Sequence, residues 1–137
     1  MTQITIETTV HADPARVWEA WNEPEHITRW AFASDDWTAP HAESDLRAGG
    51  RFKTVMAAAD GSEQFDFSGV YTRVAVGEAI EYDMDDGRHV STLFSEVPGG
   101  VRIAQTFEAE EENPVDFQRA GWQAILDNFK RYAEETS

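Results

Sequence analysis

Three polar side chains in the second half of the chain, Tyr71, Tyr82 and Gln105, lie in step with apolar neighbours. Tyr82, for example, alternates with Ile80 and Met84. Because residues two apart in a strand face the same side, we expect the phenols and the amide to point into the interior. A buried polar group needs a hydrogen-bond partner, and the hydroxyl or carbonyl of a bound ligand could supply it. A neighbouring side chain or a trapped water is the alternative partner.

Motifs for nucleophilic, metal or phosphate chemistry are missing from the sequence. It contains no cysteine and no Gly-x-Ser-x-Gly pattern, so neither a thiolate nor a nucleophile elbow is available. Its four histidines form no His-x-x-x-His or His-Glu-x-x-His pair. Gly49-Gly50 is not followed by the Lys-Ser or Lys-Thr pair that opens the helix of a phosphate loop. We therefore expect no metal, no cofactor and no catalytic triad.

Large aromatic residues gather in and just before an irregular stretch, residues 31–48. Trp30, Phe32 and Trp37 lie among Ser, Asp, Pro and His residues, a composition typical of a loop. A flexible loop gains little from large apolar side chains unless they cover an apolar space. We therefore predict that these three residues form the lid or mouth of a pocket, or plug the pocket if it is closed.

The composition favours a single folded domain, residues 1–137. The hydrophobic fraction is 41% and the aromatic fraction 12%, which suffices for a substantial core, whereas 137 residues are too few for two domains. The net charge is −15 and no basic stripe offsets it, which makes nucleic acid a poor partner. The acidic run at residues 108–112 could bind a protein with a basic face, although such runs are more often solvated loops.

The sequence also limits the expected location of the protein. Its first residues, MTQITIETTV, are polar and alternating, and no apolar run approaches the ~20 residues that a membrane helix requires. The absence of cysteine leaves the redox compartment open and fits the cytoplasm. We expect a soluble cytoplasmic protein that does not insert into membranes and is a monomer or a homodimer.

Two kinds of periodicity place the candidate residues on secondary structure. Residues 3–11 alternate between apolar and polar, as a half-buried strand does. Asp13 before Pro14 and Glu23 before Pro24 mark the starts of two short helices. Five more strands follow, and the Asp-Gly and Gly-Gly turns between them make neighbours antiparallel. These strands are predicted at residues 51–58, 63–74, 78–84, 89–97 and 101–108.

The last segment, residues 113–135, has the pattern of a long helix with a wide apolar face. No other predicted element is long enough to cover one face of the antiparallel sheet. Gly121 inside this helix costs ~1 kcal/mol relative to alanine, so we expect it to allow a close approach of helix and sheet. Phe117, Ile125 and Asn128 are available to line a cavity on that side.

Four separated motifs resemble those of one protein family in both order and spacing. They are PEHITRW (24–30), DLRAGGRF (45–52), DGSEQFDFSGVY (60–71) and GWQAILDNF (121–129). The chain is similar to the bacterial stand-alone relatives of the C-terminal domain of the activator of Hsp90 ATPase. These relatives belong to the SRPBCC superfamily of START, Bet v 1 and polyketide cyclase-like domains. The activator's separate N-terminal domain, which makes much of the chaperone contact, has no counterpart here.

The resemblance implies a helix-grip fold of the α+β class. In this fold a curved antiparallel sheet of about six to seven strands wraps around a long C-terminal helix, and two short helices follow the first strand. It also implies an apolar cavity between sheet and helix, which opens near the loop after the second short helix. Members of the superfamily bind lipids, sterols, flavonoid-like or polyketide-like molecules there, and a few catalyse cyclisation or hydrolysis.

Three functions follow as hypotheses, in order of preference. The first is non-catalytic binding of a small, apolar or aromatic ligand. The second is a cyclase or hydrolase in which Tyr71, Tyr82 or a pocket carboxylate acts as acid or base. The third is a co-chaperone-like module that binds a basic partner through its acidic surface. The residues expected to line the pocket are Trp30, Phe32, Trp37, Phe52, Met56, Phe67, Tyr71, Tyr82, Gln105, Phe107, Phe117, Gly121 and Ile125.

Overall fold

The computed structural model describes residues 2–135, which form one sheet and three helices. Within these residues, no helix combines the length and apolarity needed to span a membrane. The helices are α1 (Pro14–Asn22), α2 (Pro24–Ile27) and α3 (Val115–Glu135). The strands are β1 (Gln3–Val10), β2 (Trp37–Ser44), β3 (Arg51–Ala58), β4 (Gln64–Ala75), β5 (Ala79–Met84), β6 (His89–Val97) and β7 (Gly100–Glu108).

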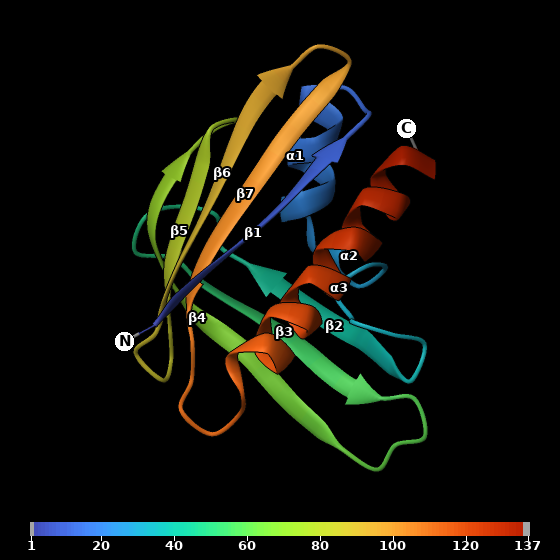
Figure 1. Cartoon of the computed structure of the whole chain (residues 1–137), viewed down its shortest axis with the longest axis vertical. Coiled ribbons are helices and arrows are strands. Elements are labelled where there is room, and N and C mark those ends of the chain that lie inside the picture. The colour runs from blue at the N-terminus through green and yellow to red at the C-terminus, as the bar shows by residue number, and fades with distance from the viewer. Residues whose placement is uncertain (1, 136–137) are drawn as a thin grey trace.

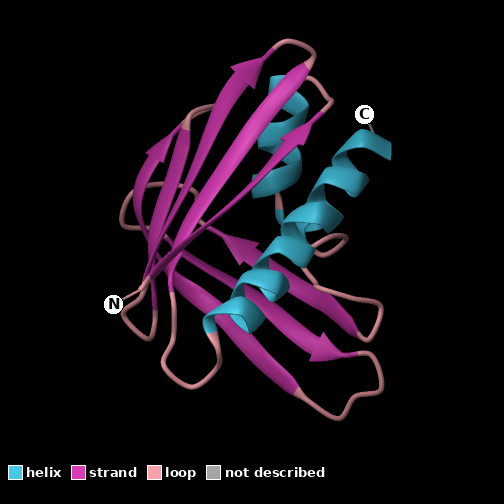
Figure 2. Cartoon of the chain, in the orientation of Figure 1, coloured by secondary structure: helices cyan, strands magenta, loops and turns pink. Residues whose placement is uncertain are grey.

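All strand pairs are antiparallel, and the sheet has seven strands in the order β1-β7-β6-β5-β4-β3-β2. The first strand pairs with the last, and every other neighbour is consecutive in the chain. The sheet curls strongly, so that α3 crosses its hollow side (Figure 1 and Figure 2). The predicted α+β helix-grip architecture is confirmed.

Strand β2 lies in the aromatic stretch for which the sequence predicted only an irregular loop. That prediction is wrong for residues 37–44, which pair with β3. The register of this pair shifts between Thr38 and His41, and the buried residues Ala39 and Ala42 are three positions apart instead of two. Because the bulge interrupts the period of two by which strands are recognised, the pattern concealed this strand.

The two short helices begin where the sequence predicts. The carboxylate of Asp13 accepts a hydrogen bond from the N–H of Ala15 at 2.9 Å, and Pro14 occupies the first helical position of α1. Pro24 begins α2 after Glu23, whose side chain makes no capping hydrogen bond. Together the helices carry the chain from β1 to β2, which are the two edge strands of the sheet.

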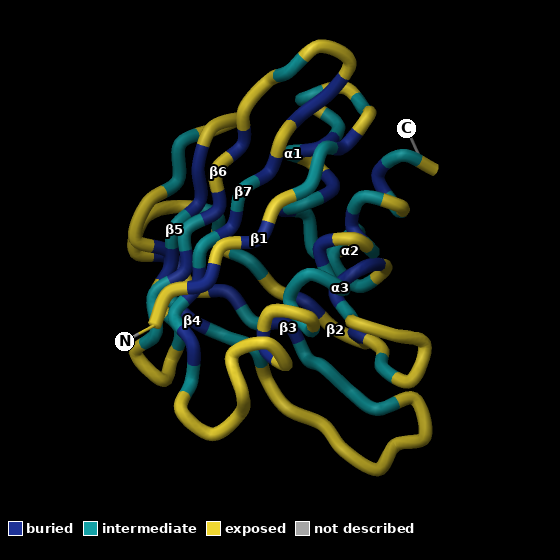
Figure 3. Tube along the Cα trace, in the orientation of Figure 1, coloured by how far each residue is buried: buried dark blue, intermediate teal, exposed yellow. Residues whose placement is uncertain are grey.

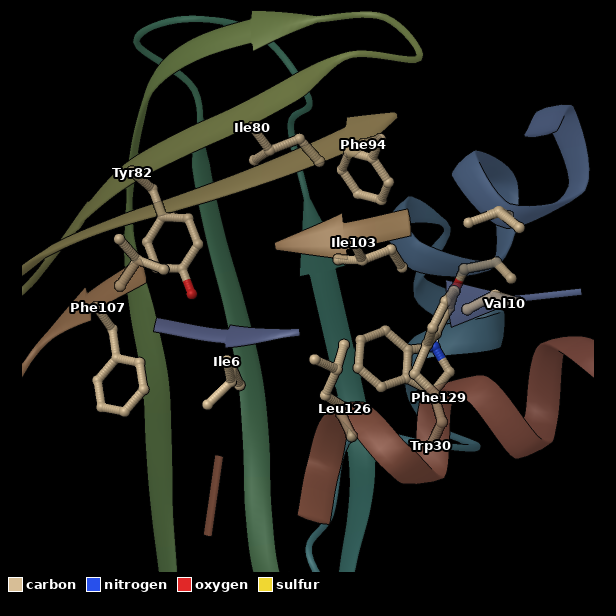
Figure 4. Packing of buried hydrophobic residues seen from close by; sticks show 14 of the residues in the cluster. Ile6, Val10, Trp30, Ile80, Tyr82, Phe94, Ile103, Phe107, Leu126 and Phe129 are labelled. Atoms are coloured by element: carbon tan, nitrogen blue, oxygen red, sulfur yellow. The ribbon is translucent and has the colours of Figure 1, made fainter. Parts of the chain in front are cut away.

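The core lies between the hollow side of the sheet and α3. Phe107 of β7 and Phe129 of α3 are fully buried, and Ile80 and Ile103 project from their strands toward the same space (Figure 4). Buried segments gather where the sheet faces the helices, whereas the hairpin ends are exposed (Figure 3). The inward positions of these strands follow the period of two that the sequence showed.

Gly121 does not bring the helix close to the sheet, so that prediction is wrong. A Cβ atom added at this position would meet no atom of the sheet within 4 Å. The close approach occurs within the sheet, at Gly69 of β4, where an added Cβ would lie 2.3 Å from the carbonyl oxygen of Asp83. The fold therefore requires a glycine between β4 and β5, where the backbones come together.

Candidate functional site

An apolar cavity of about 140 Å³ lies between the hollow side of the sheet and α3. An engineered protein cavity of ~150 Å³ binds benzene, so this space has room for about one aromatic ring. Strands β3, β4, β5 and β7 form one wall, α3 forms the opposite wall, and residues 21–31 close one end. The lining consists of Trp21, Asn22, Ile27, Trp30, Ala31, Phe52, Thr54, Met56, Phe67, Tyr71, Ile80, Tyr82, Gln105, Trp122, Ile125 and Leu126.

The inner end of the cavity is the part lined by β5 and β7, where the lining residues are all buried. Ile80, Tyr82 and Gln105 lie at this inner end with exposed fractions of 2%, 8% and 6%. Met56 of β3 and Ile125 of α3 line the cavity but are only half-buried. Trp21, Ile27, Phe67 and Trp122 are half-buried lining residues too, so several sides of the cavity are less enclosed than its inner end.

Most of the predicted pocket residues line this cavity. They come from the segment after α2, from β3, β4, β5 and β7, and from α3. These elements are far apart in the sequence, and the curl of the sheet brings them around one space. The structure brings together Trp30, Phe52, Met56, Phe67, Tyr71, Tyr82, Gln105 and Ile125.

Trp30 closes one end of the cavity. Its side chain is 5% exposed, and its indole N–H donates a hydrogen bond to the carbonyl oxygen of Ala20 at 2.9 Å. The side-chain amide of Asn128 in α3 donates to the carbonyl oxygens of Trp30 at 2.9 Å and of Phe32 at 3.5 Å. The segment after α2 is thus bound to α3, and Trp21 and Ile27 at the same end of the cavity are half-buried.

The remaining predicted residues lie outside the lining. The ring of Trp37, at the start of β2, packs 5.8 Å from the ring of Phe65, so it covers a strand end. Phe117 is 67% exposed near the start of α3, and Phe32 packs half-buried against the core. The predicted residues that do not line the cavity are Phe32, Trp37, Phe107, Phe117 and Gly121.

Phe107 is separated from the cavity by Trp122, which the sequence analysis did not place there. The two rings stack with centroids 4.0 Å apart and planes inclined by 9°. Trp122 then lines the cavity in place of Phe107. Its position three residues before Ile125, on the same face of α3, was the sequence signal for this role. Thr54 carried a similar signal, because it alternates with Phe52 in β3.

The two tyrosines of the lining differ in their hydrogen bonds. The hydroxyl of Tyr71 lies 2.8 Å from Oγ of Ser44. The hydroxyl of Tyr82 has no hydrogen-bond partner among residues 2–135. Desolvation by burial raises the pKa of both phenols above its ordinary value. Both therefore stay protonated at neutral pH, where each can donate a hydrogen bond.

Gln105 is held by Thr92 on the neighbouring strand. Its amide nitrogen Nε2 donates to Oγ1 of Thr92 at 3.0 Å, and the two residues are 6% and 0% exposed. Within the described part of the chain, the amide oxygen of Gln105 accepts no hydrogen bond. This side chain therefore presents a fixed and unoccupied acceptor at the inner end of the cavity.

Among the described residues, no charged side chain lines the cavity. The polar members of the lining are Asn22, Thr54, Gln105 and the two tyrosines. Burial of a charge without a partner is expensive, so a charged ligand would find no counter-ion inside. The cavity therefore suits a neutral and largely apolar molecule.

A second polar group lies outside the cavity, where α1, α2 and α3 meet. One side-chain atom from each of Glu19, Glu23 and His26 lies within 4.8 Å of the others. Nε2 of His26 is 3.4 Å from the guanidinium of Arg16, and Nδ1 is 2.6 Å from the hydroxyl of Tyr132. Because the guanidinium lies against the nitrogen that a metal ion would need, the group is a network that joins three helices. The spacings of four and three residues were its sequence signal, which we missed.

The comparison with protein families gives a match over nearly the whole chain. The model that describes Activator of Hsp90 ATPase homolog 1-like proteins matches residues 11–134. This range contains every residue that lines the cavity. A comparison with curated proteins found no match.

Two solved structures are similar in sequence as well as in fold. The AHSA1-like protein from Aeromonas hydrophila is 47% identical with a TM-score of 0.93, over 98% of this chain and 94% of that one. A protein from Cytophaga hutchinsonii is 48% identical with a TM-score of 0.84, over 98% of this chain and 93% of that one. A protein from Chromobacterium violaceum has a TM-score of 0.84 over 98% of this chain and 99% of that one, but at 21% identity it shows the fold alone.

Proposed function

Because the chain belongs to the family of Activator of Hsp90 ATPase homolog 1-like proteins, a family known for ligand binding, we propose that it binds a small, neutral, aromatic molecule between the sheet and α3. The observation that carries this proposal is the uncharged, aromatic cavity of about 140 Å³. Ligand sites are typically concave, mostly apolar and furnished with a few polar groups, which is the composition of this lining.

The cavity volume favours a ligand of about one aromatic ring. Pockets for drug-sized molecules have volumes of ~300–1,000 Å³, which is larger than this space. The aromatic rings of the wall also suit a flat ligand, since Phe52, Phe67 and Tyr82 pack edge-on or tilted against one another. Sterols and long acyl chains would require α3 or the aromatic side chains to move.

Binding is better supported than catalysis. A proton-transfer enzyme needs a group in the site whose pKa lies near the working pH. The titratable groups of the lining are Tyr71 and Tyr82, and burial raises the pKa of both away from neutrality. The lining supplies hydrogen bonds and apolar contact, which are the requirements of a binding site.

The direct test is thermal denaturation of the purified protein with millimolar toluene or ethylbenzene. A ligand that binds only the folded state stabilises it by ~2.7 kcal/mol at a hundredfold excess over its dissociation constant. For a domain of this size that gain raises the melting temperature by several degrees. Native mass spectrometry of the same samples would give the stoichiometry, which we expect to be one ligand per chain.

Two tryptophan substitutions in α3 locate the site. Ile125→Trp fills the cavity from its half-buried side and should abolish the shift caused by toluene. Ala120→Trp adds the same side chain at an exposed position of α3 and should leave the shift unchanged. Both variants must melt cooperatively for the comparison to count. An equal shift in the two variants, or no shift in the parent protein, would contradict binding in this cavity.

A further inference from the structure

Two polar side-chain atoms that face the inner end of the cavity have no hydrogen-bond partner in the described part of the chain. They are the hydroxyl of Tyr82 and the amide oxygen of Gln105, whose residues are 8% and 6% exposed. Neither atom is among the fully buried polar atoms of the described residues, so both are open to the space of the cavity. A molecule bound in this apolar cavity can therefore form hydrogen bonds with both of them.

The sheet register places the two atoms within reach of one small molecule. Thr92 of β6 pairs with Ile80 of β5 on one side and with Gln105 of β7 on the other. Tyr82 is two residues from Ile80, so it lies on the same face of β5. Strands β5 and β7 are two strand spacings apart, about 10 Å, which a single-ring ligand between them can bridge with the help of the long side chains. Figure 4 shows the Tyr82 hydroxyl directed away from β5 into the space that Leu126 also faces.

The two side chains offer complementary hydrogen bonds. Tyr82 is protonated at neutral pH because burial raises its pKa, so its hydroxyl can donate a hydrogen bond. Gln105 is held through its amide nitrogen by Thr92, so its amide oxygen can only accept. Tyr71 is different, because its hydroxyl already lies 2.8 Å from Oγ of Ser44.

We propose that Tyr82 and Gln105 form a polar recognition end, which selects neutral aromatic ligands that carry a carbonyl or ether oxygen and a hydroxyl. Tyr82 donates to the oxygen of the ligand, and Gln105 accepts from its hydroxyl. The ligand class is thus phenols of about one ring that also carry a ketone or ether group, in preference to hydrocarbons of the same shape. This inference rests on the proposed function, since it requires that the cavity bind a ligand at all.

The test compares probes that differ by one polar group. Acetophenone and ethylbenzene have nearly the same shape, as do phenol and toluene, and only the first of each pair can form the hydrogen bond. Dissociation constants of all four probes are measured by calorimetry for the parent protein and for Tyr82→Phe and Gln105→Met. The ratio within each probe pair cancels the apolar contribution, and its change on mutation isolates the contact of one side chain.

We expect Tyr82→Phe to reduce the preference for acetophenone over ethylbenzene about fivefold, which is the effect of one ordinary hydrogen bond. Gln105→Met should reduce the preference for phenol over toluene by a similar factor. Tyr132→Phe removes the same hydroxyl from α3, outside the cavity, and should change neither ratio. Gln105→Met leaves the hydroxyl of Thr92 without its partner, and this variant could fail to fold for that reason. In that case the double variant Thr92→Val/Gln105→Met, which removes both partners, is used instead.

The outcomes separate this inference from the proposed function. Binding of toluene and ethylbenzene with unchanged ratios in both variants would leave the cavity as a binding site and overturn the polar recognition end. Failure of all four probes to bind the parent protein would overturn both proposals together. The assignment of each contact would be supported by two results. The preference for acetophenone over ethylbenzene would fall only in Tyr82→Phe, and the preference for phenol over toluene would fall only in Gln105→Met.

Discussion

Nζ of Lys130 in α3 donates a hydrogen bond to the carbonyl oxygen of Thr9 in β1 at 2.7 Å. β1 is an edge strand, and alternate carbonyl groups of such a strand point away from its single neighbour. Side chains of α3 donate hydrogen bonds to these carbonyl oxygens at every second residue of β1. The long helix therefore pairs with the edge of the sheet as well as covering its face. The other two pairs are Arg119 with Thr5 at 3.1 Å and Gln123 with Glu7 at 3.2 Å.

Lys130→Met should therefore destabilise the protein by about 1–2 kcal/mol, because the hydrogen bond to Thr9 and the ion pair with Glu134 at 2.6 Å are both lost. The chain contains only one other lysine, Lys53, whose exposed side chain pairs with Glu43 at 3.7 Å. Lys53→Met should change the stability by less than about 0.5 kcal/mol, as expected for an exposed ion pair. Urea denaturation measures both values. Equal losses in the two variants would show that the contact with β1 contributes nothing particular.

Two Gly→Ala substitutions should change the stability in opposite directions. Gly121→Ala in α3 adds a methyl group in open space and should stabilise the protein by about 0.5–1 kcal/mol through helix propensity. Gly69→Ala in β4 places a Cβ 2.3 Å from the carbonyl oxygen of Asp83 and should destabilise it by about 2–3 kcal/mol. Thermal and chemical denaturation are the measurements. Destabilisation by Gly121→Ala would instead indicate that α3 lies close to the sheet at this position.

The two cavity tyrosines should respond differently to loss of their hydroxyl groups. Tyr71→Phe removes a hydroxyl that is bonded to Ser44 and should cost about 1 kcal/mol. Tyr82→Phe removes a hydroxyl that faces the cavity without a protein partner and should leave the stability of the ligand-free protein unchanged or raise it. Denaturation of Tyr71→Phe, Ser44→Ala and the double variant Ser44→Ala/Tyr71→Phe forms a double-mutant cycle. If Ser44→Ala and Tyr71→Phe are additive, their hydrogen bond contributes no stability.

The outer face of the sheet carries a histidine whose charge should depend on its neighbours. Nδ1 of His89 lies 2.7 Å from Asp83, and Nε2 lies 3.1 Å from Glu81. The hydrogen bond to Asp83, followed by the one to Glu81, raises the pKa of His89 above its ordinary value of 6.5. The folded protein thus binds this proton more tightly than the unfolded chain does.

The stability that His89 contributes should accordingly be complete below about pH 6.5 and decline as the pH rises through its folded-state pKa. The difference in unfolding free energy between the parent protein and His89→Gln should therefore shrink between about pH 6 and pH 9. Titration of the imidazole by NMR should give a lower pKa in Asp83→Asn than in the parent. A pH-independent difference, or an unchanged pKa in Asp83→Asn, would contradict this account.

Most elements of the fold could be predicted because their signals are local. The Asp13-Pro14 pair marks the start of α1, and the observed cap confirms it. The glycines of the hairpin turns, such as Gly87 with φ 92° and Gly99 with φ 81°, adopt the positive φ that such turns demand. Strand β2 escaped prediction because its bulge lies between its two buried residues, and the pairing with β3 that stabilises it is not local.

The cavity could be predicted only in part. Side-chain direction along a strand follows from alternation, which explains why Phe52, Tyr82 and Gln105 lie in the lining as expected. Which of two inward aromatics reaches the space is a matter of packing between elements. Trp122 stacks on Phe107 and takes its place, and nothing in the separate patterns of α3 and β7 decides between them.

The sequence by itself determined the order of the elements other than β2 and the inward faces of the strands that alternate. These features depend on residue type, turn chemistry and spacing along the chain. The tertiary structure alone decided that Tyr82 and Gln105 keep unpaired polar atoms while Tyr71 finds Ser44. Hydrogen-bond partners depend on the curl of the sheet and the position of α3, which bring together atoms that are distant in sequence and lie beyond any local signal.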